Sequence, residues 1–207
     1  MLPILMRVIF AGFILAAAWG CSHDHRVRIE PELYVRPSTA GQQLPVAVRV
    51  VDARPRRAIY EKEAGPRTKI IGSLNKVNIY PGTPVDDPIR EKVEQGLSTL
   101  GFQPVRGDKK GPRWLRIEVL QLRMISHFQK PKLKIPARHV RLRIALRVNA
   151  QTAAGTYRKI YRTQLDKSSK VLTGGFKNEQ FINNGLSLTL QKIFEDASLI
   201  AFLSATP

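Results

Sequence analysis

The stretch of sequence that decides the fold is H-V-R-L-R-I-A-L-R-V-N-A, which runs from His139 to Ala150. Every even-numbered residue from Val140 to Val148 is a large aliphatic one, and the residues between them are polar or small. A period of two is typical of a β-strand that turns one face to an apolar core and the other to water. The stretch therefore predicts a strand whose outer face carries Arg141, Arg143 and Arg147.

Further strands are predicted on both sides of this one. Residues 152–155 form a short turn that joins it to the last strand of the chain. Arg158 and Arg162 share one face of that last strand, so they extend the arginine row if the register permits. The other strands expected are 44–51, 76–80, 114–125 and 157–165, with an extended segment at 102–105.

Two amphipathic helices are also predicted. The first is expected to be capped by Asp86 or Asp87 and terminated by Gly101, residue types that favour these positions. The second covers residues 177–203, starting at Lys177 or Asn178, and has an unusually wide apolar face. We interpret that width as deep burial against the sheet, and a partner surface is the alternative. The expected stripe is Ile182, Leu186, Ile193, Ala197 and Ile200, with Phe181, Leu188, Leu199 and Phe202 outside it.

The order of these elements indicates an α+β fold in a single domain, residues 44–207. An antiparallel or mixed sheet of about five strands is expected to carry two helices on one face and to expose the other to solvent. Asp52-Ala53-Arg54-Pro55 follows the first strand. We interpret this segment as a structural turn in which Asp52 accepts backbone hydrogen bonds, with a ligand site as the alternative.

The first twenty residues are predicted to be a signal peptide rather than part of the fold. Twelve apolar residues, from Val8 to Trp19, follow Arg7 and lead to a small-residue exit. A helix that spans a bilayer needs about 20 apolar residues, which disfavours a retained transmembrane helix.

Cys21 stands at the exit of this signal and is the only cysteine in 207 residues. Ala18-Trp19-Gly20-Cys21 resembles the lipobox of bacterial lipoproteins, in which the thiol receives a diacylglyceryl group; a stray or free thiol is the alternative. An aspartate after the cysteine favours inner-membrane retention, so Ser22 points to the outer membrane. Residues 21–43 are then a lipidated N-terminus and a solvated linker. Within them, His23-Asp24-His25 offers too few ligands for a metal site.

No motif in the sequence indicates catalysis, a cofactor or a metal centre. The patterns H-E-x-x-H, G-x-S-x-G and G-x-x-x-x-G-K are absent. His127 and His139 have no carboxylate close by in sequence and are interpreted as structural, and Glu118 stands alone in its strand. We therefore expect a protein that is not an enzyme. An envelope hydrolase whose site is assembled from distant residues is the alternative.

The chain carries a formal net charge of +18. In a cytoplasmic protein this charge would indicate nucleic-acid binding, which requires the signal to be misread. For an exported protein, the expected partner is instead an anionic lipid, lipopolysaccharide, a wall polymer or an acidic envelope protein. The alternative is a basic face that only keeps the protein soluble. The candidate contact residues are Lys130, Lys132, Lys134, Arg138, Arg141, Arg143, Arg147, Arg158 and Arg162.

The chain resembles the YajG-like family of bacterial lipoproteins in four features. They are Cys21, the strand leading into Asp52-Ala53-Arg54-Pro55, the helix end Leu97-x-x-Leu100-Gly101-Phe102, and the terminal amphipathic helix. The resemblance covers essentially the whole mature chain and implies an outer-membrane lipoprotein with no known enzymatic activity. The strong basic charge departs from the family. We expect a lipid-anchored periplasmic domain that acts as a non-enzymatic binding or accessory module in envelope maintenance.

Overall fold

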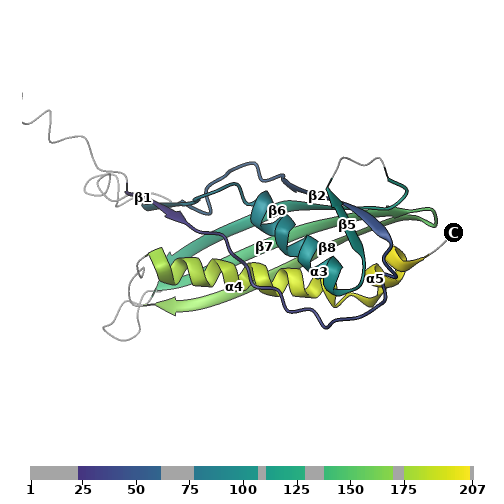
Figure 1. Cartoon of the computed structure of the whole chain (residues 1–207). Helices are drawn as coiled ribbons and strands as arrows, with labels where there is room; N and C mark the ends of the chain where they lie inside the picture. Colours follow the sequence, from purple (N-terminus) through teal and green to yellow (C-terminus); the bar gives the residue numbers. More distant parts are fainter. Residues whose placement is uncertain (1–22, 62–76, 107–110, 129–137, 170–174, 206–207) are drawn as a thin grey trace, which may run out of the picture.

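The computed structural model describes residues 23–61, 77–106, 111–128, 138–169 and 175–205. Within these ranges the chain forms one eight-stranded sheet and three helices, arranged as an elongated α+β molecule (Figure 1). The strands are β1 (His23–Val27), β2 (Pro45–Asp52), β3 (Tyr60–Glu61), β4 (Val77–Pro81), β5 (Gln103–Arg106), β6 (Trp114–Phe128), β7 (Arg138–Thr152) and β8 (Gly155–Ser169). The helices are α3 (Asp86–Thr99), α4 (Gly175–Phe194) and α5 (Ala197–Ser204).

Three long antiparallel strands form the body of the sheet. β6, β7 and β8 span 15 residues each, and β7 pairs with both neighbours along its whole length. The alternation predicted for β7 is confirmed, because Leu142, Ile144 and Leu146 are at most 1% exposed. The arginines between them lie on the opposite face, as a period of two requires.

Beyond β6 the sheet divides, because two strands share the outer edge of β6. β2 runs parallel to its first half, and β3 pairs with it further along, at Met124. β5 completes the first branch, and β4 and β1 complete the second. The connection from β2 to β3 therefore leaves the sheet beside a bulge between Val119 and Gln121. The predicted mixed α+β sheet is confirmed, and it exceeds the expected five strands because β1, β3 and β5 join it.

All three helices cover the same face of the sheet (Figure 1). α3 packs on β2, whereas α4 packs on β7 and β8 and α5 on β7. Gly185 allows α4 to lie close to β7, since a Cβ there would come within 2.7 Å of the Leu142 side chain. α3 starts at Asp86, but the predicted aspartate cap is wrong: the N-cap is Val85, without a side-chain cap hydrogen bond, and Asp86 and Asp87 lie in the first turn. The helix ends as predicted where Gly101 adopts a φ of 82°, a backbone conformation that favours glycine.

The predicted last helix is in fact two helices. α4 ends at Phe194, and α5 begins at Ala197 with Asp196 as its N-cap. The side chain of Asp196 accepts a hydrogen bond from the Ser198 backbone N–H, which is the ordinary way to begin a helix.

The break shifts the phase of the apolar stripe. Ile182, Leu186 and Ile193 are buried as predicted, but Ala197 is exposed and Ile200 is only half-buried. Leu199 and Leu203 are buried in their place. The wide apolar face thus belongs mainly to the core, and Leu188, which is 43% exposed, is the exception.

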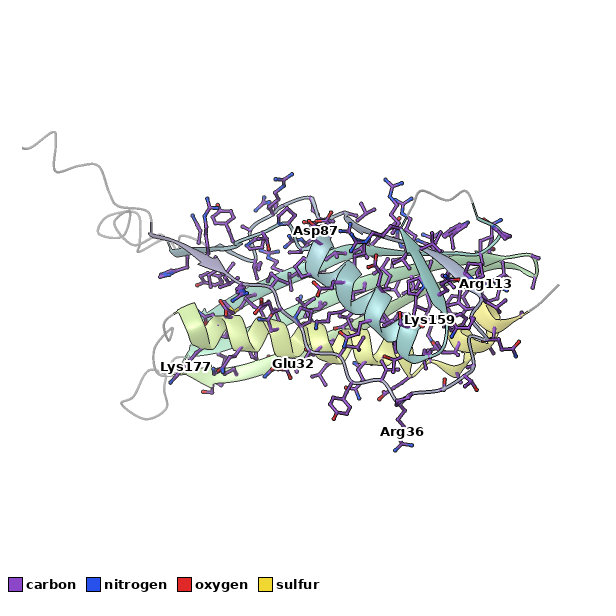
Figure 2. The ribbon with its side chains drawn as sticks, viewed as in Figure 1. Glu32, Arg36, Asp87, Arg113, Lys159 and Lys177 are labelled. Carbon is purple, nitrogen blue, oxygen red and sulfur yellow. The ribbon has the colours of Figure 1, made fainter. Side chains whose placement is uncertain are left out.

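The structure corrects the predicted domain boundary, because residues 23–43 belong to the fold and are not a solvated linker. β1 pairs in parallel with β4, and Val27 and Ile29 are each 1% exposed. The segment after β1 then crosses α4, where Figure 2 shows Glu32, before it reaches Arg36, whose side chain points away from the molecule.

Backbone hydrogen bonds hold this segment on α4. The backbone amides of Arg28, Glu30 and Glu32 donate to the side chains of Glu179, Asn183 and Ser187, at 2.9, 2.9 and 2.8 Å. The donors are two residues apart on extended chain and the acceptors four apart on a helix. Both spacings advance by about 6 Å, so the two patterns match.

Candidate functional site

The face of the sheet that carries no helix is rich in arginine, and we call it the open face. Cross-strand partners point to the same face, so the register extends the row of β7 onto its neighbours. Arg143 lies opposite Arg123 of β6, and Ala145 lies opposite Arg162 of β8. The described arginines of the open face are Arg49, Arg116, Arg123, Arg141, Arg143, Arg147, Arg158 and Arg162.

Two carboxylates accompany these arginines at the described open-face positions of β2, β6, β7 and β8. Asp166 pairs with Arg141 at 2.7 Å, and Glu118 pairs with Arg116 and Arg147 at 3.0 Å each. The hydrogen bond from Arg141 holds the pKa of Asp166 below its usual value. Arg158 and Arg162 are exposed, and within the described ranges no ion pair ties either of them to a carboxylate.

Five of the predicted contact residues come together on the open face: Arg141, Arg143, Arg147, Arg158 and Arg162. The register of β8 does permit the predicted extension of the row. Lys130, Lys132 and Lys134 lie outside the described residues, as does Cys21. Arg138 opens β7, and its side chain is not among those described.

Three further arginines of this face were not among the predicted contacts. Arg49 and Arg116 follow the alternation of their own strands, which was a usable signal. Arg123 was hidden by the bulge in β6, because the extra residue moves the outward positions from even to odd numbers. Glu118 and Arg123 therefore share a face although their numbers differ in parity.

A hollow of about 680 Å³ opens at the centre of this face. Ala145 lies in its wall at the place where the row of β7 lacks an arginine, and it is only 6% exposed. The segment between β2 and β3 and the bulge of β6 complete the wall. Four arginines line it, Arg54, Arg56, Arg123 and Arg162, and no carboxylate is among the described lining residues.

Asp52 and Arg54 form the structural turn that the sequence predicts. Nε and Nη2 of Arg54 donate to the two carboxylate oxygens of Asp52, at 2.8 Å each. Burial favours a higher pKa for Asp52, but the bonds from Arg54 hold that pKa below its usual value. The Arg54 side chain is 3% exposed, and its Nη1 has no hydrogen-bond partner among the described residues. Arg54 also lines a second cavity, of about 840 Å³, at the start of α3.

A strongly perturbed carboxylate lies elsewhere, at Asp196 between α4 and α5, where hydrogen bonds hold its pKa well below the usual value. Its carboxylate accepts hydrogen bonds from Tyr157 at 3.0 Å, from Tyr161 at 2.6 Å, and from Lys159. Perturbed groups of this kind are candidates for catalysis. Here the side chain is 7% exposed and its oxygens are occupied by the fold, so we assign it a structural role.

Neither a metal centre nor a membrane-spanning helix is found in the part of the chain that the structure describes. No three potential ligands among His, Cys, Asp and Glu cluster there. None of its helices has the length and the apolar character needed to cross a bilayer.

Two solved structures are similar to this chain at low sequence identity. Protein XCC0632 from Xanthomonas campestris, of family-model DUF330, is 14% identical with a TM-score of 0.51, over 84% of this chain and 95% of that one. A minor lipoprotein from Acinetobacter baumannii is 10% identical with a TM-score of 0.36, over 79% and 94% of the two chains. Of these two structures, the first is similar enough to indicate a common fold. The curated proteins include no match.

Most of the chain also matches a protein family. Residues 31–204 match the model of a family described as uncharacterized lipoprotein. The matched range contains every described element from β2 to α5, so it covers most of the sequence. The resemblance to YajG-like lipoproteins is thereby confirmed, and the chain belongs to this family of uncharacterized lipoproteins.

Proposed function

We propose that this lipoprotein is held at the outer membrane by lipid on Cys21, and that its periplasmic domain is a non-enzymatic binding or accessory module of envelope maintenance. In this proposal the open face contacts an anionic partner. The observation that carries it is the convergence of eight arginines from four strands on a face without helices.

The residue type supports binding over a purely solubilising role. At the described open-face positions of the four strands, every cationic residue of the Lys and Arg type is an arginine. The planar guanidinium group binds phosphate and carboxylate through two parallel hydrogen bonds, which a lysine does not do. At these described positions eight arginines stand beside two carboxylates, so this part of the face has a net positive formal charge. Near an anionic surface each such charge contributes about 1 kcal/mol, which together is enough to hold a domain already concentrated by an anchor.

The anchor we propose lies next to the folded domain. β1 begins at His23, two residues after Cys21, and two residues reach about 7 Å at most. Lipid on Cys21 therefore keeps the β1 end of the sheet at the membrane. Two or more acyl chains on one residue make such attachment stable, because each buried CH₂ contributes about 0.8 kcal/mol.

Cys21→Ala is expected to abolish lipidation, because the proposed modification requires the thiol. The variant should no longer incorporate a fatty-acid probe and should leave the membrane fraction during flotation. Cys21→Ser removes the same thiol with little change in size and should behave alike. Fatty-acid incorporation into either variant would contradict the proposed anchor.

Charge reversal on the open face is expected to weaken anion binding. Soluble protein that starts at Ser22 keeps the whole described core, so it can be mixed with vesicles containing phosphatidylglycerol at low salt. Arg143→Glu with Arg158→Glu should lower the affinity by at least about tenfold, and added salt should weaken binding of the wild type by screening.

The matched control reverses two exposed cations away from the open face. Arg36→Glu with Lys177→Glu changes the net charge by the same amount, and Figure 2 shows both side chains on the helix side of the molecule. Equal loss of binding in both double variants would indicate attraction by net charge alone. Circular dichroism checks that each protein is folded.

A further inference from the structure

The hollow at Ala145 combines positive charge with an apolar wall. Ala145 stands between Gln121 of β6 and Arg162 of β8, its cross-strand partners on the open face. An arginine in place of alanine would continue the row of β7 and fill this space. The small side chain therefore creates the hollow in the middle of the charged face.

Four guanidinium groups line the hollow without a carboxylate among its described walls. Arg162 comes from β8, Arg123 from β6, and Arg54 and Arg56 from the segment after β2. Arg54 already gives two of its donors to Asp52. A cluster of guanidinium groups suits a group with several anionic oxygens, because guanidinium binds such oxygens through parallel hydrogen bonds. Phosphate meets this requirement better than a single carboxylate does.

The rest of the wall combines Gln121 with apolar residues. Pro55, Ala58 and Leu120 line the hollow together with Ala145, whereas Ile59, also in the wall, is 0% exposed. Its volume of about 680 Å³ is far larger than one phosphate needs and falls in the range of pockets that hold small organic molecules. An inorganic ion would leave this apolar surface in contact with water, whereas a ligand with an apolar body would cover it.

We propose that the hollow at Ala145 binds one molecule of an anionic phospholipid, with the phosphate among Arg56, Arg123 and Arg162 and the adjoining apolar part against Pro55 and Leu120. This inference rests on the proposed function and makes it more specific. The open face attracts an anionic surface, and the hollow selects a phosphate ester on it.

The test measures binding of monomeric dihexanoylphosphatidylglycerol to soluble protein starting at Ser22, by calorimetry below the micelle concentration. Inorganic phosphate and dihexanoylphosphatidylcholine are the comparison ligands. The anionic lipid is expected to bind at least about tenfold more tightly than either, because only it supplies both the net negative charge and the apolar part. Equal affinity for inorganic phosphate overturns the inference and leaves a site for small anions only.

Two variants examine the site itself. Ala145→Leu keeps every charge and fills the hollow, and Arg162→Gln removes one exposed guanidinium from its wall. Each is expected to lower the affinity for the short-chain lipid by about tenfold, the usual effect of losing a charged hydrogen bond or the space for a group. The second variant keeps the inference open to refutation if the first does not fold. Ala47→Leu, on the open face but outside the hollow, and Lys177→Gln, on α4, should bind as the wild type does.

Vesicle binding separates failure of this inference from failure of the proposed function. If the wild type binds anionic vesicles but not the short-chain lipid, or if Ala145→Leu and Arg162→Gln both bind that lipid normally, the hollow is not the site. If neither vesicles nor short-chain lipid bind at low salt, both proposals are wrong.

Discussion

Asp196→Ala is expected to lower the free energy of unfolding by about 3–5 kcal/mol, because one carboxylate joins the last helix to the sheet. The carboxylate of Asp196 accepts hydrogen bonds from three side chains of β8, those of Tyr157, Lys159 and Tyr161. It also accepts one from the backbone N–H of Ser198 in the first turn of α5. A lost N-cap costs about 1 kcal/mol, and a lost hydrogen bond to a charged acceptor about 1.5–3 kcal/mol. The contributions are not additive within such a network, so the expected total lies below their sum.

The effect of this substitution depends on pH. Burial favours a higher pKa for Asp196, but hydrogen bonds from Lys159, Ser198, Tyr161 and Tyr157 outweigh it and hold the pKa well below its usual value of 3.8. A lowered pKa in the folded state means that the stabilisation is fully present above the unfolded pKa and is lost as the pH falls below it. The difference in stability between wild type and variant should be constant near neutral pH and shrink below about pH 4.

Asp166→Ala is the matched control for Asp196→Ala. Asp166 also pairs with a cation and also has a lowered pKa, but its side chain is 49% exposed on the open face. Exposed ion pairs contribute little to stability because solvent screens them, so little destabilisation is expected. Urea unfolding followed by circular dichroism, at pH 7 and at pH 3, measures both variants. Equal destabilisation by the two substitutions would show that the hydrogen bonds to Asp196 stabilise the fold no more than an exposed ion pair does.

Ile193→Ala is expected to destabilise the domain by about 2–5 kcal/mol, because it leaves a cavity where α4 faces the sheet. Ile193 is 0% exposed and belongs to the main apolar core. Thermal unfolding should show a clearly lower midpoint, with the open face unchanged.

Leu188→Ala on the same helix is the matched control, since Leu188 is 43% exposed. Its truncation removes a side chain of the same size and leaves no buried cavity, so the midpoint should shift little. A wild-type melting curve for Ile193→Ala would contradict the assignment of this stripe to the core. A large loss in Leu188→Ala would instead indicate that this side chain is covered by another molecule in solution.

Much of the fold could be predicted from local patterns. The alternation from Val140 to Val148 determined both the strand β7 and which of its residues face outward, since a period of two admits one arrangement. The position of α3 was local as well: acidic residues mark its first turn, although neither caps it, and Gly101 marks its end. The turn at Asp52 and Arg54 was equally local, because two residues two positions apart make all of its bonds.

Other features depended on residues far apart in the chain. The apolar pattern after Phe194 continues as if one helix ran to Leu203, so the break between α4 and α5 is not visible in the sequence. The residues next to Asp196 also give no sign of its three hydrogen-bond donors on β8. The segment from Val27 to Arg36 alternates apolar and polar residues, and its burial follows that period, so the linker prediction overlooked a signal that was present. The sequence could not show that the amides of Arg28, Glu30 and Glu32 meet acceptors on α4 more than 150 positions later, because those acceptors belong to another element.

The sequence by itself determined the strand β7, the outward direction of its arginines, the position of α3 and the resemblance to a lipoprotein family. Each of these depends on neighbouring residues or on a period within one element. Only the tertiary structure decided that the arginines of β2, β6 and β8 join the row, that the bulge of β6 brings Arg123 among them, and that Ala145 lines a hollow between them. Register and bulges are set by hydrogen bonds between strands far apart in the chain, and shifting a strand by one residue turns all its side chains to the other face.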